Sequence, residues 1–429
     1  MMEGLGYAPY ESYKDSHANW LGEVPTDWQV GPGRICIYEN KDKNTGMKES
    51  TVLSLSYGRV IVKDEDKMTG LVPESYETYQ IVQPGDIIIR GTDLQNDVTS
   101  LRTGLAKDHG IITSAYINLR PKPNAYAEFL HYLLHSYDVK KVFYGLGSGL
   151  RQNLSYVDFK YLTIPLPSLP QQRAIAAFLD DKCAKIDRAV KIKEDQIALL
   201  RERRQIIIQD AVTRGLNPAA PMKDSGIDWI GQIPAHWDVK RGKFLFAKVE
   251  RPVRIQDDIV TCFRDGQVTL RSNRRTEGFT NALQEHGYQG IRKGDLVIHA
   301  MDAFAGAIGV SDSDGKATPV YSVCVPRIKN TVDPPFFAQL MRQIALSGLL
   351  VSLAKGIRER STDFRYGDFA SLLLVVPPLS EQKEITAYIQ AVTEKIENGI
   401  AIKERQIAAL KEYKTSLINA AVTGKIKVI

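Results

Sequence analysis

The chain has 429 residues, of which 43% are hydrophobic and 25% charged, and its formal net charge is +6. This length predicts two or three domains with ordinary globular cores, and the mild positive charge is compatible with nucleic acid without requiring it. No run approaches the ~18 consecutive apolar residues of a membrane helix. The four cysteines are scattered and form no Cys-x-x-Cys pair, which favours reduced thiols and a cytoplasmic location.

The sequence contains an internal duplication. The first copy opens with Trp20-Leu21-Gly22, Val24-Pro25 and Trp28, and the second opens with Trp229-Ile230-Gly231, Ile233-Pro234 and Trp237. Further pairs follow in the same order: Gly85-Asp86 with Gly294-Asp295, Thr113-Ser114-Ala115-Tyr116 with Thr318-Pro319-Val320-Tyr321, Gly149-Leu150-Arg151 with Gly356-Ile357-Arg358, and Tyr156-x-Asp158-Phe159 with Tyr366-x-Asp368-Phe369. Solenoids have many short repeats, so two long copies predict two related domains in tandem.

The globular parts have the pattern of a mixed α/β fold. Short apolar strands are expected over residues 87–90, 111–119 and 296–299, separated by polar loops. Each Gly-Asp pair predicts a turn that leads into a buried strand, and an aspartate in such a turn is usually structural. A helix is expected over roughly 126–137 in the first copy and 336–353 in the second.

Each copy ends in a long helix with an apolar seam. Residues 171–214 contain no Gly or Pro, and apolar residues recur there about every 3.5 residues, as they do after residue 381. The seam consists of Leu179, Ile186, Val190, Lys193, Ile197, Leu200 and Ile207 in the first helix and Ile389, Ile396, Ile400, Lys403, Ile407, Leu410 and Leu417 in the second. Its polar breaks match, Lys193 with Lys403 and Arg204 with Lys414. Such a seam needs a partner helix, and the other copy's helix is the expected partner. The alternatives are a helix of another chain and packing on the helix's own globular domain.

Two motifs resemble a methyltransferase. Asp333-Pro334-Pro335-Phe336 is similar to the signature of amino-methyltransferases, and Phe304-Ala305-Gly306-Ala307-Ile308-Gly309 is weakly similar to a glycine-rich S-adenosylmethionine loop. They lie too close in sequence to end different strands of one doubly wound sheet. We therefore expect Asp333 to cap a helix whose first turn contains Pro334 and Pro335.

No other catalytic or metal-binding signature is complete. His131 and His135 are one helical turn apart, but the zinc-protease pattern needs Glu where Tyr132 stands. Asp86 and Asp295 are not followed by the acidic-x-Lys triplet of metal-dependent nucleases, and the chain lacks a phosphate-binding Gly-x-x-x-x-Gly-Lys-Ser/Thr loop. We expect no metal, no cofactor and no ATP use in this chain.

Several polar loops are suited to DNA. They carry Arg and Lys, which neutralise phosphates, and Arg, Asn and Gln, which form bidentate contacts with bases, and the sequence around them shows no matched acids. The candidates are Lys41, Lys43, Asn44, Lys48, Arg90, Gln95, Asn96, Arg102, Arg151 and Gln152 in the first copy and Arg264, Gln267, Arg271, Asn273, Arg274, Arg275, Arg358 and Arg360 in the second. A single such loop is more often plain solvated surface; paired basic loops in duplicated domains favour DNA.

The ordered set of motifs resembles the specificity subunits of type I restriction-modification systems. The resemblance covers nearly the whole chain and rests on the repeated tryptophan entry, the segment from Gly85 through Thr92-Asp93-Leu94-Gln95-Asn96-Asp97 to Tyr116, and two paired elements. The first is Ile164-Pro165-Leu166-Pro167-Ser168-Leu169-Pro170-Gln171-Gln172, echoed by Val376-Pro377-Pro378-Leu379-Ser380-Glu381-Gln382. The second is Ala211-Val212-Thr213-Arg214-Gly215, echoed by Ala421-Val422-Thr423-Gly424-Lys425. The second copy departs at His299-Ala300-Met301-Asp302, so the target-reading loops are expected to differ.

The resemblance implies a division of labour. It implies two target-recognition domains, 1–170 and 217–380, and two spacer helices, 171–216 and 381–429, that pair as an antiparallel coiled coil. Each domain would read one half of a bipartite, asymmetric double-stranded DNA site. Two methyltransferase subunits and restriction subunits would bring S-adenosylmethionine, ATP and Mg²⁺, leaving this chain non-catalytic. Two alternatives stay open: a DNA methyltransferase fused to its own reader, and a coiled-coil scaffold without a DNA role.

Overall fold

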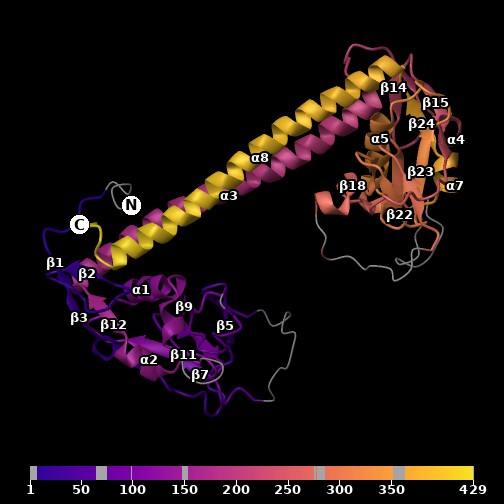
Figure 1. The fold of residues 1–429 in the computed structure, drawn as a ribbon. Helices are drawn as coiled ribbons and strands as arrows, with labels where there is room; N and C mark the ends of the chain where they lie inside the picture. The colour runs from indigo at the N-terminus through magenta and orange to yellow at the C-terminus, as the bar shows by residue number, and fades with distance from the viewer. Residues whose placement is uncertain are drawn as a thin grey trace. The chain divides into compact units, whose positions relative to one another are not determined.

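The computed structural model describes residues 7–63, 75–97, 99–146, 153–274, 277, 286–350 and 363–428 of the chain (Figure 1). The chain forms two compact units: unit 1 contains residues 1–194 and 404–429, and unit 2 contains residues 195–403. Each unit therefore combines one globular region with parts of both long helices. Within the described ranges, no helix has the length and apolar character that crossing a membrane requires.

Unit 1 is built on an antiparallel sheet with the strand order β4-β11-β8-β9. These strands are β4 (Ile37–Glu39), β8 (Ile87–Ile89), β9 (Thr103–Leu105) and β11 (Ile117–Pro121). Two-stranded ribbons pair β1 (Tyr13–Asp15) with β2 (Glu23–Pro25), β3 (Gln29–Pro32) with β12 (Thr163–Leu166), β5 (Leu53–Ser56) with β6 (Arg59–Val62), and β7 (Gln80–Val82) with β10 (Gly110–Ile112). The helical elements are η2 (Gly33–Ile35), α1 (Ala127–Val139), η4 (Val142–Gly145) and α2 (Tyr156–Tyr161).

Unit 2 repeats the sheet and ribbons of this plan strand by strand. Its sheet has the order β16-β23-β20-β21, formed by β16 (Phe246–Lys248), β20 (Leu296–His299), β21 (Ile308–Val310) and β23 (Tyr321–Pro326). Ribbons pair β13 (Met222–Asp224) with β14 (Gln232–Pro234), β15 (Asp238–Arg241) with β24 (Leu373–Val376), β17 (Val260–Cys262) with β18 (Val268–Leu270), and β19 (Gln289–Ile291) with β22 (Gly315–Ala317). The helical elements are α4 (Gly242–Leu245), η5 (Arg271–Asn273), η6 (Ala303–Ala305), α5 (Pro334–Leu346) and α7 (Tyr366–Ser371). The predicted tandem α/β fold is confirmed.

The bounds of the helix that follows each sheet agree closely with the prediction in unit 1 and less closely in unit 2. In unit 1, α1 lies within two residues of the expected 126–137. In unit 2, α5 ends at Leu346, well before the expected residue 353. Gly348 follows it with a φ of 82°, a left-handed conformation that glycine adopts readily at the end of a helix. The predicted helix is therefore interrupted at Ser347 and Gly348; residues 349 and 350 are again helical, and residues 351–353 of the prediction lie outside the described residues.

Each central strand is buried on both faces. Ile87 and Ile89 of β8 point into one core with Trp28 and Phe129, and the intervening Ile88 points into a smaller core with Leu53. Successive side chains of a strand alternate between the faces of a sheet, so a strand covered on both sides needs an unbroken apolar run. The second unit repeats this division at β20.

The Gly-Asp turns are structural, as predicted. Gly85 and Gly294 have φ values of 94° and 91°, which glycine adopts without a steric penalty. The buried carboxylate of Asp86 accepts a hydrogen bond from the guanidinium of Arg120 at 2.7 Å, and that of Asp295 pairs with Arg251. Each aspartate therefore ties the turn to a neighbouring segment of its own unit.

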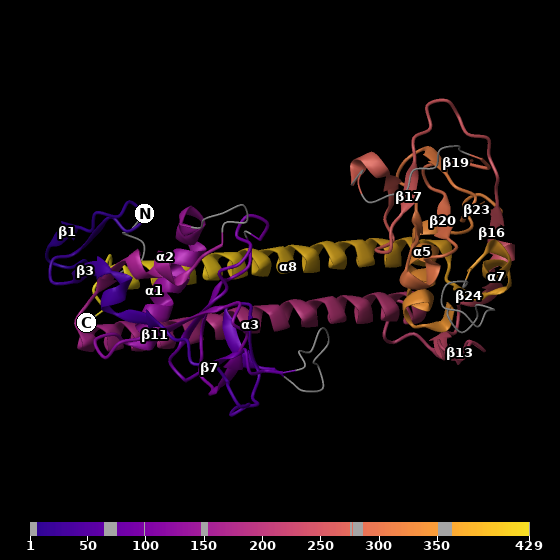
Figure 2. The same cartoon turned by 90° about the horizontal axis from the view of Figure 1, so that it is seen from below.

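The long helices α3 (Leu169–Arg214) and α8 (Leu379–Val422) lie side by side in each unit (Figures 1 and 2). In unit 1, Lys193 Nζ donates to Gln406 Oε1 at 2.7 Å and Lys414 Nζ to Asp187 at 2.7 Å. In unit 2 the equivalent pairs are Lys403 with Gln196, at 2.7 Å, and Arg204 with Glu397. Residue numbers rise along one helix as they fall along the other, which confirms the antiparallel pairing.

The same pairs explain the polar breaks in the seam. Apolar seam positions are buried or partly buried; the buried ones are Leu179, Ile186, Val190, Ile197, Ile389, Ile396, Ile400 and Leu417. Each polar break instead reaches a glutamine or carboxylate of the facing helix. A slip in the alignment of the helices would separate all these pairs at once, so they favour one register.

The ends of both helices are locked to the globular cores. Gln172 near the start of α3 is fully buried; its side chain accepts from the N–H of Tyr126 at 2.7 Å and donates to the carbonyl of Pro167. Gln382 forms the equivalent contacts with Asp333 and Pro377 near the start of α8. These buried amides fix the direction in which each long helix leaves the preceding sheet.

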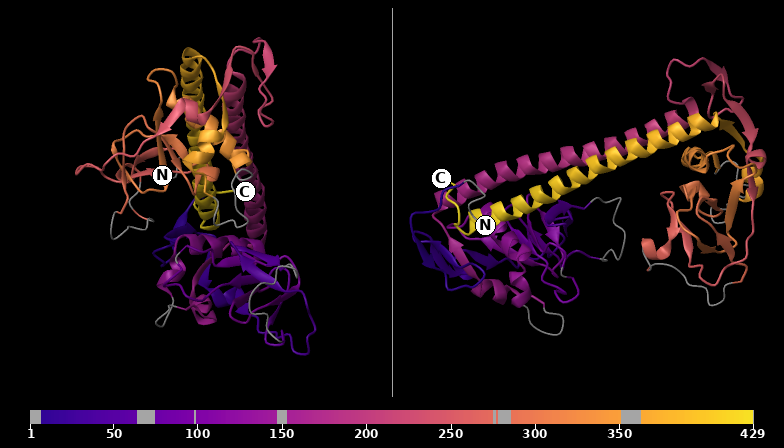
Figure 3. Two further views of the ribbon diagram at one scale, coloured as in Figure 1. Left: turned by 90° about the vertical axis from the view of Figure 1, so that its right-hand side faces the viewer. Right: turned by 45° about the horizontal axis from the view of Figure 1, so that its top comes forward.

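The far end of each helix reaches a tryptophan of the entry motif. A Cβ on Gly215, after α3, would lie 3.1 Å from Trp237, and one on Gly424, after α8, would lie 2.2 Å from Pro25 and 3.3 Å from Trp28. Beyond Gly424, the N–H of Lys427 donates to the carbonyl of Ala8 at 2.7 Å, which joins the segments near both chain ends in unit 1 (Figure 3). The last part of α8 therefore completes the core of the first copy.

We expect Gly399→Ala to stabilise unit 2. Gly399 lies inside α8, and an added Cβ would meet Leu200 Cδ1 at 3.9 Å, an ordinary van der Waals distance. Alanine exceeds glycine in helix propensity by about 1 kcal/mol, so the midpoint of urea denaturation should rise. Gly424→Ala is the control, since its Cβ has no room and its φ is 70°; it should lower the midpoint. A loss of stability in Gly399→Ala would contradict the packing described.

Candidate nucleic-acid interface

Arg102 organises the polar loop that follows β8. Its side chain is fully buried, and its guanidinium donates to the carbonyl oxygens of Arg90 at 3.1 Å, Thr92 at 2.8 Å and Asp93 at 3.3 Å. Nε also donates to the hydroxyl of Tyr144 at 3.1 Å. A guanidinium occupied in this way cannot reach a phosphate or base. The predicted DNA contact of Arg102 is wrong; the residue shapes the loop instead.

The remaining candidates in this loop lie on its surface. Gln95 and Asn96 are exposed, and Asn96 Nδ2 donates to Asp93 Oδ1 at 2.7 Å. Arg90 is partly exposed and pairs with Asp97 at 3.3 Å. Hydrogen bonds from Ser100, together with the charge of Arg90, lower the pKa of Asp97 to about 2, so this pair is charged at any neutral pH. The loop therefore presents amides and a partly neutralised arginine.

The candidates between residues 41 and 48 differ in burial and in whether they form an ion pair. Asn44 is fully buried and closes its own loop, donating to the carbonyl of Glu49 at 2.8 Å and accepting from the Glu49 N–H at 2.9 Å. Because its amide is occupied in this way, the DNA contact predicted for Asn44 is wrong. Lys41 is paired with Glu39 at 2.9 Å. Lys43 and Lys48 are exposed and form no ion pair within the described residues, which leaves both ammonium groups available to an anionic ligand.

Unit 2 gathers its candidates on β17, β18 and η5, and several of them are paired with acids. Arg264 contacts Asp302 at 2.9 Å, and Arg274 contacts Asp265 at 2.7 Å with its guanidinium 4.2 Å from the ring centroid of Phe263. The prediction that these arginines lack matched acids is wrong. Asp265 lies in the same segment as Arg274, and Asp302, which is distant in sequence, reaches Arg264 through the fold.

The other candidates of unit 2 face neighbouring side chains. Arg271 Nε donates to Thr261 Oγ1 at 3.0 Å, Asn273 Nδ2 donates to Thr269 Oγ1 at 2.9 Å, and Gln267 accepts from Arg274 at 3.3 Å. Asn273 and Gln267 are nevertheless exposed. Five predicted residues lie outside the described ranges: Arg151, Gln152, Arg275, Arg358 and Arg360.

Arg342 is a residue that sequence reasoning missed. It projects from α5 and donates to the carbonyl of Arg264 at 3.0 Å and to that of Gly306. It thus holds the loops of unit 2 from a helix, whereas Arg102 holds those of unit 1 from within the loop. Its sequence signal, a lone arginine in an apolar helix, does not reveal this role.

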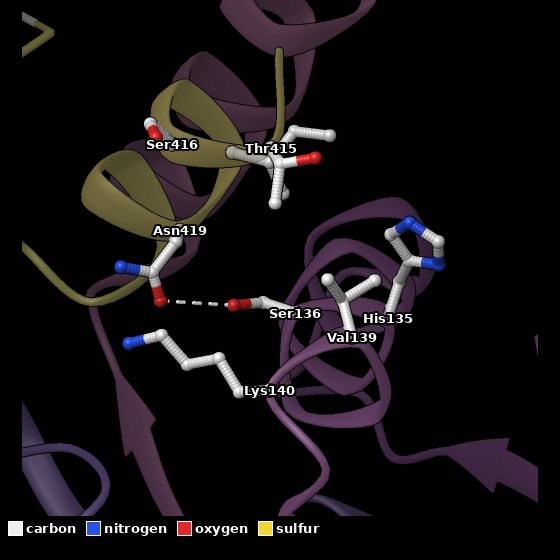
Figure 4. Close-up of a pocket in the computed structure, with 8 residues that line it drawn as sticks. His135, Ser136, Val139, Lys140, Thr415, Ser416 and Asn419 are labelled. Atoms are coloured by element: carbon white, nitrogen blue, oxygen red, sulfur yellow. Dashed lines mark hydrogen bonds between the residues drawn. The ribbon is translucent and has the colours of Figure 1, made fainter. Parts of the chain in front are cut away.

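A pocket of about 130 Å³ lies in unit 1 between α1 and the last part of α8 (Figure 4). Ser136 Oγ donates to Asn419 Oδ1 at 3.0 Å, and the ring of His135 lies on the other side of Val139 from that hydroxyl (Figure 4). Serine and histidine are therefore not paired as a nucleophile and base would be. Packing of α8 on α1 accounts for this pocket.

The apparent catalytic motifs have structural roles. Asp333 caps α5 by accepting from the N–H of Phe336 at 3.2 Å, with Pro334 and Pro335 in the first turn, as predicted. The rings of His131 and His135 lie 6.1 Å apart, and burial lowers the pKa of His131 to about 3, which keeps its imidazole neutral. Among the described residues, no group of three His, Cys, Asp or Glu side chains is placed to hold a metal ion.

Known proteins are similar to this chain in sequence and in fold. A family model for the type I restriction modification DNA specificity domain matches residues 38–198. A Methanocaldococcus jannaschii protein, provisionally named as the specificity subunit of the type I restriction enzyme MjaX, is 23% identical over 99% of both chains. The chain is thus similar, over nearly its whole length, to type I restriction-modification specificity subunits. The MjaVIII specificity subunit of the same organism is 25% identical over 74% of this chain and 75% of its own length.

Solved structures of specificity subunits have the same fold. The HsdS subunit from Thermoanaerobacter tengcongensis aligns with a TM-score of 0.53 at 15% identity, covering 94% of this chain and 98% of its own. A chain from a study of complex assembly and conformational transition of the type I R-M system aligns with a TM-score of 0.65 at 16% identity, covering 93% and 98%. The tandem units with paired helices are thus the fold of specificity subunits.

We expect Arg102→Ala to destabilise unit 1 by about 3 kcal/mol, because it leaves several buried carbonyl groups without a donor. Arg102→Lys should recover only part of this loss, since an ammonium cannot span the same carbonyl oxygens. Urea denaturation measures both. Arg90→Ala, which removes one partly exposed ion pair, is the control and should cost about 1 kcal/mol or less. Equal effects of the two alanine variants would refute the structural role of Arg102.

Proposed function

We propose that this chain is a type I specificity subunit that reads a split, asymmetric double-stranded DNA site, with each unit reading one half. One observation carries the proposal: the two units repeat the same scaffold while the loops on it differ. The loop after β8 is long and held by Arg102, whereas the equivalent loop after β20 is short and held by Arg342. One scaffold with two sets of loops suits two different half-sequences on one DNA molecule.

We further propose that the chain is non-catalytic and acts through partners. Two methyltransferase subunits would supply S-adenosylmethionine chemistry, and restriction subunits would supply ATP-driven cleavage with Mg²⁺. The engagement of Asp333 as a helix cap supports this division, because the carboxylate also accepts from Thr386 at 2.8 Å and so has no role left in binding a target amine. The paired helices, which join neither sheet, are the proposed docking element for these partners.

A domain exchange tests the proposal. Residues 229–376 are replaced by the same region of a related subunit, and the methylated sequence is mapped genome-wide with and without the exchange. Only one half of the recognised sequence should change. A change in both halves would show that the units do not read separately. Binding of S-adenosylmethionine by the purified chain alone would favour a fused methyltransferase, and absence of DNA binding by the assembled complex would favour a scaffold.

We expect the double variant Lys43→Ala, Lys48→Ala to weaken DNA binding and reduce its salt dependence. Each lysine that neutralises a phosphate adds about 0.9 to the slope of log K against log salt, so the slope of the assembled complex should fall by up to about 2. Lys41→Ala is the matched control, because Glu39 already pairs with that ammonium. A slope unchanged in the double variant would place the phosphate contacts elsewhere.

We expect the length of the paired helices to set the unread gap between the two half-sites. Insertion of one heptad after Leu200 in α3 and one after Gly399 in α8 preserves the seam, because these positions face each other. Seven residues add about 10 Å at ~1.5 Å per residue, close to three base pairs at ~3.4 Å each. Methylation mapping should find both half-sequences intact and the gap lengthened.

The control for this insertion is a heptad in α3 alone. It leaves α8 too short for its partner and breaks the pairs Lys193–Gln406 or Arg204–Glu397, so it should lower stability without producing a clean new spacing. A folded paired variant that still modifies only the original spacing would rule out the helices as the ruler.

A further inference from the structure

The hairpin of β5 and β6 ends in an unusual tip. Its two turn residues, Tyr57 and Gly58, have φ values of 47° and 75°, and Ser56 pairs with Arg59 to close the turn. A two-residue turn with both φ values positive is type I′, which favours Asn-Gly. A tyrosine rarely adopts this conformation. The residue is 95% exposed, so no contact within the described protein explains why a tyrosine stands there.

The tip stands on a rigid base. A Cβ on Gly58 would lie 3.0 Å from Leu101, and one on Gly104 of β9 would lie 2.5 Å from Leu55 and 3.1 Å from Val60. The hairpin therefore packs directly against β9 through these two glycines. Leu101 immediately precedes Arg102, whose guanidinium holds the polar loop. Tyr57 is thus a fixed aromatic projection beside that loop.

The chemistry around the tip suits DNA. Residues 53–63 contain two basic side chains, Arg59 and Lys63, and no acidic one. Both are exposed, and neither forms an ion pair within the described part of the chain. The adjoining loop presents the amides of Gln95 and Asn96. Proteins that bind DNA grooves use this set of groups. Cations neutralise phosphates, amides read base edges, and an aromatic ring can wedge against bases.

The second unit carries the same hairpin with a different tip. The turn between β17 and β18 is one residue longer, Arg264-Asp265-Gly266, and closes with the N–H of Phe263 donating to Gln267. Gly266 has a φ of 90°, as a three-residue turn of this kind requires. The Arg264 side chain stays 71% exposed despite its ion pair with Asp302. The scaffold is shared, and the group that it projects differs.

We propose that these hairpin tips are specificity determinants: Tyr57 contacts the DNA groove in one half-site, and Arg264 contacts the groove in the other. This inference rests on the proposed DNA-reading function. Arginine at such a position reads guanine through paired hydrogen bonds, whereas tyrosine reads shape and stacking. The difference between the two tips therefore contributes to the asymmetry of the recognised sequence.

Tyr57→Asn is the decisive variant, measured in the full chain assembled with its methyltransferase subunits. Asparagine is favoured in a type I′ turn, so the melting temperature should stay equal or rise. Affinity for the recognised site should nevertheless fall about tenfold, the scale of one lost base-pair contact, while affinity for unrelated DNA changes about twofold or less. Methylation mapping should show relaxed choice at one or two positions of a single half-site. Tyr57→Phe keeps the ring and should retain most of the affinity.

Two comparisons complete the experiment. Arg264→Ala should relax only the opposite half-site, and Tyr161→Ala, which removes an exposed tyrosine on α2, should change neither half. Unchanged affinity and an unchanged methylated sequence in Tyr57→Asn would overturn the inference. A loss of bound methyltransferase subunit with normal affinity in the remaining complexes would overturn it in favour of a protein contact at the tip. If the unmodified complex prefers no sequence, the proposed function itself fails, whatever Tyr57 does.

Discussion

The architecture depends on burial of the seam between α3 and α8. These helices have 46 and 44 residues, and each carries an apolar stripe that water would otherwise solvate. Long helices gain most of their stability from packing such a stripe, so neither is expected to persist alone. Because each unit contains a stretch of both helices, the same contact that stabilises the helices also completes the two globular cores. Leu179 and Leu417 lie in one core, and Val212 and Ile389 lie in the other.

The scaffold separates what must be constant from what can vary. The buried glutamines Gln172 and Gln382 recur at equivalent places and form equivalent contacts. The turn aspartates Asp86 and Asp295 also recur, and each accepts from the backbone N–H three residues before it. Loops attached to this frame differ in length, in charge and in the arginine that supports them. The loops can therefore change without disturbing the helices, because the contacts that orient the helices lie elsewhere in each unit.

Much of the fold was predictable from the sequence because it depends on periodic patterns. The duplication predicted tandem domains, the 3.5-residue seam predicted paired helices, and the Gly-Asp motifs predicted turns, since each signal is local or repeated. The roles of individual polar residues were not predictable. Arg102 and Asn44 resemble surface residues by type, but tertiary contacts bury them. Arg264 seemed unpaired because its partner, Asp302, comes close only in the folded unit.

The exposed hairpin tip is another feature whose role could not be predicted from the sequence. Tyr57 carries no motif, and an aromatic residue next to a glycine in a short apolar run predicts a strand rather than a projecting turn. Only its φ and its exposure distinguish it from a core tyrosine. Residues that face a ligand are often exposed and lack contacts within their own protein, and a sequence pattern does not show this.

The return of α8 to the first copy has a consequence for synthesis on the ribosome. Trp28 emerges early, yet Leu417, Val422 and Gly424, which pack in its core or against it, are made only after the whole second copy. Until then, the nascent first copy exposes an apolar surface that its own helix does not cover. The second copy has no such delay, because α3 precedes it. Prematurely terminated chains should therefore retain this open surface and be preferred substrates for chaperones and proteases.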